Sequence, residues 1–155
     1  MNLKLILLIT TIIVNAILWL SYLKDKLSYS DFGEIKSNTL RYYMLTIASL
    51  AYLSNLLFVI ILISKKDISD LDYKIAIFSI FVYYILQLFF FPLVRHSIKT
   101  KNKMFVRLLL LICCIPMFAL SLISLNYKYL ILKVLSFFTL IHVFVNDAIL
   151  YGFLF

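Results

Sequence analysis

Three polar side chains stand close together near the C-terminus, within the segment LIHVFVNDAILYGFLF at 140–155. They are His142, Asn146 and Asp147, and the rest of that segment is almost entirely apolar. An imidazole and a carboxylate at staggered depths in a membrane can hand on a proton through water. The three residues therefore mark the first candidate site for a proton or a small polar ligand.

The spacing of His142 and Asp147 limits what a regular helix would allow. Five residues along an α-helix correspond to about 7.5 Å of rise and about 140° of rotation, so the two side chains should not stack directly. A structural alternative is an Asp147 held in a salt bridge and a neutral His142 bonded to a facing Asn or Tyr side chain. Ionisable residues within a membrane are often functional, so the functional interpretation stays open beside this structural one.

Three arginines are candidates to balance the charge of Asp147. This residue is expected about 12 Å inside its helix end, in the same half of the bilayer as the connections on its own side. Helix parity brings Arg107, Arg95 and Arg41 to that half. We expect the contact with Arg107 first, because the short NYKY turn at 126–129 should make the two helices that it joins antiparallel neighbours.

Other predicted spans also carry polar residues near their centres. These are Asn15, Asn55 and Gln87, and Tyr83 shares a helical face with Gln87. Amides that face lipid cost several kcal/mol, so each should turn inward and find a partner. Two interpretations stay open: hydrogen bonds that hold the helices in register, or a buried site for a proton, a small cation or a polar small molecule.

Long apolar runs must position these residues. The chain of 155 residues is 65% hydrophobic and 14% charged, whereas a soluble domain is roughly 45–50% apolar and about 25% charged. Four uncharged runs reach the roughly 18 residues that cross a bilayer, and a fifth is interrupted by Asp147. The sequence predicts an all-α integral membrane bundle with short loops, a single transmembrane domain over 1–155. Its five spans are expected at 3–23, 41–64, 74–96, 105–126 and 130–153.

The formal net charge of +8 indicates orientation, because the basic residues lie at the edges of the spans. Such a charge would suggest nucleic acid in a soluble protein, but no nucleic-acid partner is expected for a membrane bundle. Nine of the 15 lysines and arginines fall on the side of the C-terminus, which predicts a cytoplasmic C-terminus. The basic loop Arg95–Arg107 either signals topology alone or attracts anionic lipid.

Known catalytic and channel motifs are missing from the sequence, which argues against an enzyme. Cys113 and Cys114 are adjacent and point about 100° apart on a helix, so no disulfide, metal site or cofactor is expected.

The preferred hypothesis is a small transport or channel-like protein that handles a proton or a small polar ligand at mid-membrane, as a homo-oligomer or within a membrane complex. The alternative is a non-catalytic accessory or anchoring subunit of a larger complex. A lipid-processing enzyme with His142 as general base is disfavoured, because no nucleophile stands near it in sequence.

Overall fold

The structure, a computed structural model, describes residues 3–24, 37–64 and 68–152. It is 91% helical and holds no strand in the described part. Its elements are α1 (Leu3–Lys24), α2 (Asn38–Ser64), α3 (Asp70–Leu88), α4 (Phe90–Thr100), α5 (Met104–Leu125), α6 (Leu130–Ile141) and the π-helix η2 (His142–Tyr151). Helices are the expected outcome for such apolar segments, because in lipid a helix satisfies every backbone polar group within the segment itself.

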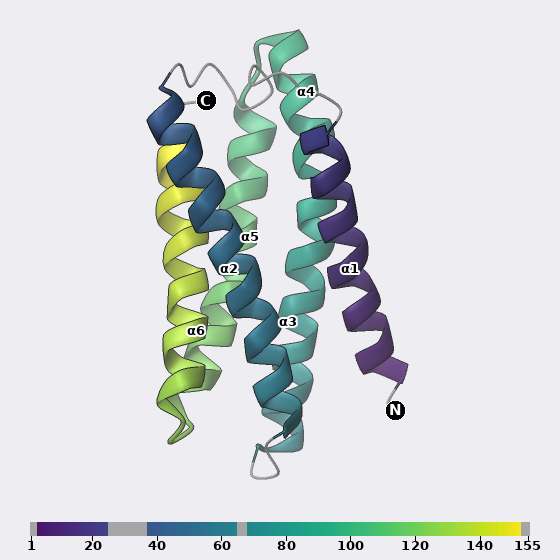
Figure 1. The fold of residues 1–155 in the computed structure, drawn as a ribbon, viewed down its shortest axis with the longest axis vertical. Coiled ribbons are helices and arrows are strands. Elements are labelled where there is room, and N and C mark those ends of the chain that lie inside the picture. The colour runs from purple at the N-terminus through teal and green to yellow at the C-terminus, as the bar shows by residue number, and fades with distance from the viewer. Residues whose placement is uncertain (1–2, 25–36, 65–67, 153–155) are drawn as a thin grey trace.

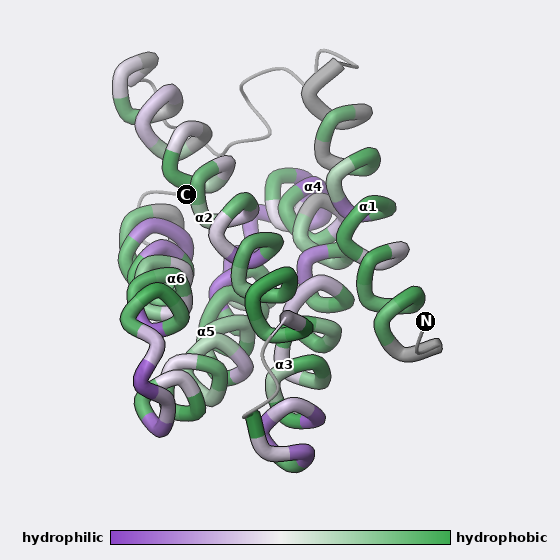
Figure 2. Tube along the Cα trace, turned by 60° about the horizontal axis from the view of Figure 1, so that its bottom comes forward, coloured by the Kyte–Doolittle hydropathy of each residue, from purple (hydrophilic) through white to green (hydrophobic). Residues whose placement is uncertain are grey.

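The seven described elements form five rods, because α4 continues α3 and η2 continues α6 (Figure 1). Four rods are long and apolar enough to cross a membrane: Tyr42–Ser64, Asp70–Thr100, Met104–Leu125 and Leu130–Leu150. The apolar part described for α1, Leu5–Leu18, is shorter. The predicted all-α fold is thus confirmed, and hydrophobic residues dominate most of the length of the helices, with hydrophilic ones at the turn that leads into α6 (Figure 2).

The packing order of the rods differs from their order in the chain. Helix α1 packs on α3, α3 packs on α5, and α5 packs on both α6 and η2. Helix α2 has its main contact with α6, and it touches α3 only lightly. Helix α1 begins at one end of the bundle, and η2 finishes at the opposite end (Figure 1). The expected antiparallel pairing of the helices on either side of 126–129 is confirmed by the α5–α6 contact.

Two helix boundaries differ from the predicted ones for identifiable physical reasons. Helix α3 begins at Asp70 rather than at 74, because Ser69 caps it: the Ser69 hydroxyl accepts a hydrogen bond from the Asp72 N–H at 3.1 Å. At its other end α3 breaks at Phe89, three residues before Pro92. Proline has no N–H for the carbonyl of Leu88, so the chain makes a tighter turn there, with Phe89 N–H donating to Leu86 at 3.0 Å.

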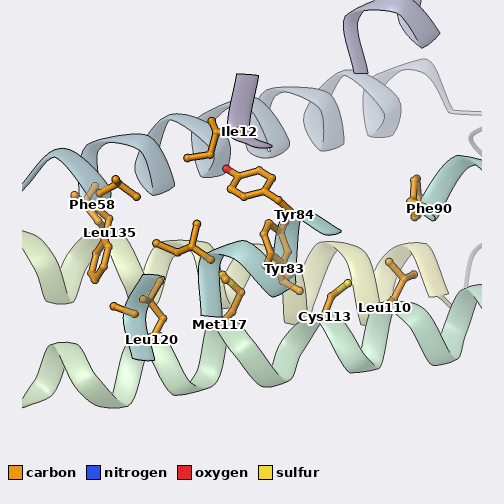
Figure 3. Packing of buried hydrophobic residues seen from close by; sticks show 14 of the residues in the cluster. Ile12, Phe58, Tyr83, Tyr84, Phe90, Leu110, Cys113, Met117, Leu120 and Leu135 are labelled. Carbon is orange, nitrogen blue, oxygen red and sulfur yellow. The ribbon is translucent and has the colours of Figure 1, made fainter. Parts of the chain in front are cut away.

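A buried apolar core runs along the bundle and includes the residues labelled in Figure 3. Phe58, Leu120 and Leu135 fill it on one side of the adjacent Tyr83 and Tyr84, with Phe90 set apart on the other side (Figure 3). Elsewhere serines join α5 to α6: the Ser124 and Ser136 hydroxyls lie 2.7 Å apart, and the Ser121 hydroxyl donates to the Ser136 carbonyl at 3.2 Å. These serines therefore form hydrogen bonds between helices, which is the role that one of the two interpretations gives to buried polar residues.

Candidate functional site

The π-helix η2 changes the geometry expected for His142 and Asp147. In this segment backbone bonds follow the i to i+5 pattern, as in the bond from the Gly152 N–H to the Asp147 carbonyl. Residues five apart therefore share a face, and His142 Nε2 lies 3.7 Å from Asp147 Oδ2. The expectation that these two side chains do not stack is wrong, because it assumed α-helical rotation through this segment.

Asn146 completes a short polar chain with this pair. Its side-chain nitrogen lies 3.2 Å from His142 Nδ1. When the amide donates to Nδ1, a neutral imidazole carries its proton on Nε2, the nitrogen that faces Asp147. The His142 side chain is 6% exposed, whereas that of Asp147 is 22% exposed. The histidine is thus held from both sides, and the carboxylate is the accessible end of the chain.

The three arginines predicted as counter-charges take different positions. Arg107 Nε donates to the Gly152 carbonyl at 2.7 Å, which satisfies a carbonyl at the end of η2. In the described part of the chain, Asp147 lies against His142, a contact that is an ion pair only when the histidine is protonated. The expected Asp147–Arg107 contact is not formed, because Arg107 bonds to the Gly152 carbonyl. Arg95 is exposed on α4, and the side chain of Arg41 lies outside the described residues.

A cavity of about 390 Å³ lies between α1, α2, α3, the start of α4 and η2. Six of the residues singled out from the sequence line it: Asn15, Asn55, Tyr83, Gln87, His142 and Asp147. The seventh, Asn146, is buried and supports His142. The expectation that mid-span polar side chains turn inward is confirmed by this burial, and their role in binding stays a prediction.

Some polar groups at the cavity are already engaged. Asn15 Nδ2 donates to the Tyr84 carbonyl at 3.0 Å, and the Tyr52 hydroxyl donates to the Ile12 carbonyl at 2.8 Å. Both bonds join α1 to the rest of the bundle. Gln87 Nε2 makes a weak contact of 3.9 Å with the Cys113 sulfur. These groups position the walls of the cavity.

Asn55 differs from the other amides. It is 1% exposed, and neither its side-chain nitrogen nor its oxygen has a hydrogen-bond partner. The neighbouring Tyr84 hydroxyl, also at the cavity, has none either. Leaving a buried polar group unpaired costs about 1–3 kcal/mol. Even a bond between Asn55 and Tyr84 would leave one Asn55 atom open, so this wall is suited to a polar ligand.

Aromatic rings form much of the remaining wall, and most of them were missed in the sequence. Tyr84 packs edge-to-face on Tyr52 and on Tyr83, with ring centroids 5.9 Å and 5.3 Å apart. Phe90 lines the same cavity. The spacing held a usable signal, because Tyr52 precedes Asn55 by three residues and Tyr84 precedes Gln87 by three, which places each pair on one helix face.

The cavity reaches the outer surface of the bundle between α1 and α2. Leu20 of α1 and Leu53 of α2 both line it, and both are exposed, Leu20 by 64%. An apolar rim of this kind faces lipid in a membrane, so the opening is lateral.

The basic loop and the cysteines lie apart from this opening. Lys101, with a left-handed backbone at φ 55°, and Asn102 turn the chain into α5 beside an open groove of about 580 Å³ that Arg107 and Leu108 also line. Binding of anionic lipid there stays a prediction. Cys113 is buried and Cys114 half-buried, both as free thiols. Among the described residues no cluster of three or more His, Cys, Asp or Glu side chains could hold a metal ion.

Fold and site together define a class of protein: an all-helical bundle, compatible with a multi-pass membrane protein, with a partly polar cavity among its apolar helices. No family model, no curated protein and no solved structure matches the chain.

Proposed function

We propose that the protein is a small membrane transporter that binds a small polar ligand in this cavity and couples its movement to a proton held by His142 and Asp147. The observation that carries the proposal is the meeting of this ionisable pair and the unpartnered Asn55 at one cavity. A cavity of about 390 Å³ lies at the small end of the range for ligand pockets, which is about 300–1,000 Å³.

The identity of the partner of Asp147 supports a role for protons. A carboxylate in the middle of a membrane costs roughly 2.5–3.5 kcal/mol, so it needs compensation. An arginine would neutralise Asp147 permanently, because the guanidinium does not lose its proton in proteins. Histidine can lose its proton near neutral pH. The His142–Asp147 pair can therefore exist as neutral or negative, and a ligand can respond to that difference.

The apolar packing supports a transporter rather than an open pore. Phe58, Leu120 and Leu135 are buried and fill the bundle on one side of the tyrosines (Figure 3). A ligand in the cavity faces this packed layer, so passage requires the helices to rearrange. Alternating access of this kind has its binding site near the middle of the membrane.

Transport by the reconstituted full chain tests the proposal. Proteoliposomes with an imposed pH gradient would be given a panel of small amines, amides, amino acids and sugars, with solute uptake and internal pH both measured. We expect at least one solute to move together with a change in internal pH, and Asp147→Asn to abolish both. The matched control is Asp70→Asn, an exposed residue at the start of α3 whose ion-pair partner is Lys74. Absence of any such movement in the unmodified protein would reject transport.

A further inference from the structure

We infer that the ligand of the cavity is a small organic cation with an apolar or aromatic group, and that it displaces the proton of the His142–Asp147 pair. This inference rests on the proposed function and specifies its substrate class.

The charge of the cavity selects for a cation. Asp147 is the acidic residue that lines it, and no lysine or arginine lines it in the described part of the chain. The other described acids, Asp70 and Asp72, lie in the first turn of α3, at one end of the bundle. When the His142–Asp147 pair holds no proton on either the ring or the carboxylate beyond that of the neutral imidazole, the cavity carries the uncompensated negative charge of Asp147. An anion would be repelled there, and a neutral solute would leave the carboxylate unpaired.

The surroundings of the pair leave this charge intact. Tyr83 of α3 and Cys113 and Cys114 of α5 lie close enough to interact electrostatically with Asp147, and phenols and thiols are uncharged in their ordinary forms at pH 7. Tyr52 is the titratable group that α2 contributes to the cavity wall. Helix α6 carries Lys133 near its first residue, at the end of the helix that is far from η2.

Arg107 is the cation that α5 brings to the end of η2. Its Nε bonds to the Gly152 carbonyl, on the turn that follows Asp147. Arg107 does not line the cavity, so a bound cation would not meet it.

The walls suit the body of an organic cation. Tyr52, Tyr83, Tyr84 and Phe90 line the cavity, and aromatic rings attract cations through their faces. Asn55 Oδ1 is an unpartnered acceptor for an ammonium N–H, even if the Asn55 amide nitrogen bonds to the neighbouring Tyr84 hydroxyl. The lateral opening beside Leu20 and Leu53 admits an amphiphilic molecule from the membrane.

Competition follows from the single carboxylate. The site either holds a proton, which cancels the charge of Asp147 through His142 or directly, or it holds the ligand cation. Binding is then an exchange in which the protonated protein and the cation give the cation complex and one released proton. No further reactant is needed, and charge is conserved.

Matched probes test the substrate class on the purified full chain in detergent. Benzyltrimethylammonium carries a fixed positive charge, neopentylbenzene is its neutral isostere, and phenylacetate is a related anion. Binding would be measured by equilibrium dialysis, and proton release as a pH drop in weakly buffered solution. We expect the cation to bind at least about tenfold more tightly than either other probe, a difference of about 1.4 kcal/mol, and to release a proton.

Two variants locate the binding. Asp147→Asn should weaken cation binding at least about tenfold and abolish proton release, and Asp70→Asn should change neither. Ala48→Phe fills the cavity while leaving every charge in place, so it should abolish binding even if Asp147→Asn fails to fold. Its control is Leu50→Phe on the outer face of α2, where Leu50 is 44% exposed.

The outcomes separate this inference from the proposed function. Equal binding of all three probes, all lost in Ala48→Phe, would overturn the cation class and leave a ligand-binding cavity. Cation binding that is unchanged in Ala48→Phe would overturn the site itself. Cation binding without proton release would overturn the exchange, and failure of every probe to bind the unmodified protein would overturn the inference, while the transport assay above would still decide the proposed function.

Discussion

His142 Nε2 and Asp147 Oδ2 face each other at 3.7 Å across one turn of a π-helix, and Asn146 holds the other ring nitrogen of the histidine. π-helical segments are rare in proteins, and single-turn ones are frequently found at functional sites. Here it places an acid and a base, five residues apart in sequence, at one cavity wall.

The two members of this pair should be energetically coupled. His142→Gln leaves the partly buried carboxylate without its partner, and we expect a loss of about 1–3 kcal/mol in the free energy of unfolding, the cost of an unpaired polar group. Adding Asp147→Asn removes the stranded charge and should recover most of that loss. Unfolding in mixed micelles with increasing dodecyl sulfate would give the coupling energy. Additive costs of the two substitutions would show that the pair is not coupled.

Substitution by leucine should change the stability of the protein in opposite directions at Asn55 and at Asn15. Asn55→Leu removes two unpartnered buried atoms, so the ligand-free protein should become more stable by about 1–3 kcal/mol, while ligand binding weakens. Asn15→Leu removes the bond to the Tyr84 carbonyl and should destabilise. The measurement is thermal unfolding with and without benzylammonium, whose N–H groups can donate to Asn55 Oδ1. A loss of stability in Asn55→Leu similar to that in Asn15→Leu would indicate that Asn55 has a structural role only.

The hydrogen bond between the Ser124 and Ser136 hydroxyls, which joins α5 to α6, should contribute modestly to the free energy of unfolding. Ser124→Ala and Ser136→Ala each remove the bond between the two hydroxyls, and a double-mutant cycle should give about 0.6 kcal/mol, and at most about 1.7 kcal/mol. Ser64→Ala is the control, because that hydroxyl bonds to the Ile60 carbonyl within its own helix. Transport should be unaffected in all three variants, and a transport defect would extend the functional site to this contact.

Tyr127 should hold one end of the bundle together. Its hydroxyl accepts from the Ser69 N–H at 3.1 Å and donates to Asp72 Oδ2 at 2.5 Å. Tyr127→Phe should therefore cost about 1.5–3 kcal/mol, the range for hydrogen bonds to charged groups. Tyr73→Phe serves as the control, since its hydroxyl has no comparable bond in the described part of the chain. Unfolding midpoints of the two variants would be compared, and equal midpoints would refute this role.

The part of the site that sequence reasoning could find follows from one physical constraint. An amide or imidazole in mid-membrane is costly unless it turns inward, and this alone brought Asn15, Asn55, Gln87 and His142 together. The approximate positions of the helices followed from the apolar runs, although both boundaries of α3 differ from the predicted ones. The α5–α6 pairing followed from the short turn at 126–129, because a short connection leaves two helices few other arrangements.

Other features depend on packing that composition does not encode. The π-helical bonding of η2 departs from the regular rotation that sequence spacing assumes, so the facing of His142 and Asp147 could not be derived. The expected depth of Arg107 in the membrane predicted a contact with Asp147, but the Arg107 guanidinium donates to the Gly152 carbonyl instead. The ring contacts of Tyr84 with Tyr52 and Tyr83 were equally hidden, because apolar runs give no rotation of one helix relative to another.

The packing order of the rods has a consequence for biogenesis. The main partner of α1 is α3, and the main partner of α2 is α6, which is synthesised after α3, α4 and α5. Neither early helix can therefore dock on its main partner when it leaves the ribosome, because that partner has not yet been made. A chain that stops before α6 would leave α2 without its principal neighbour, the kind of orphaned helix on which membrane quality control can act.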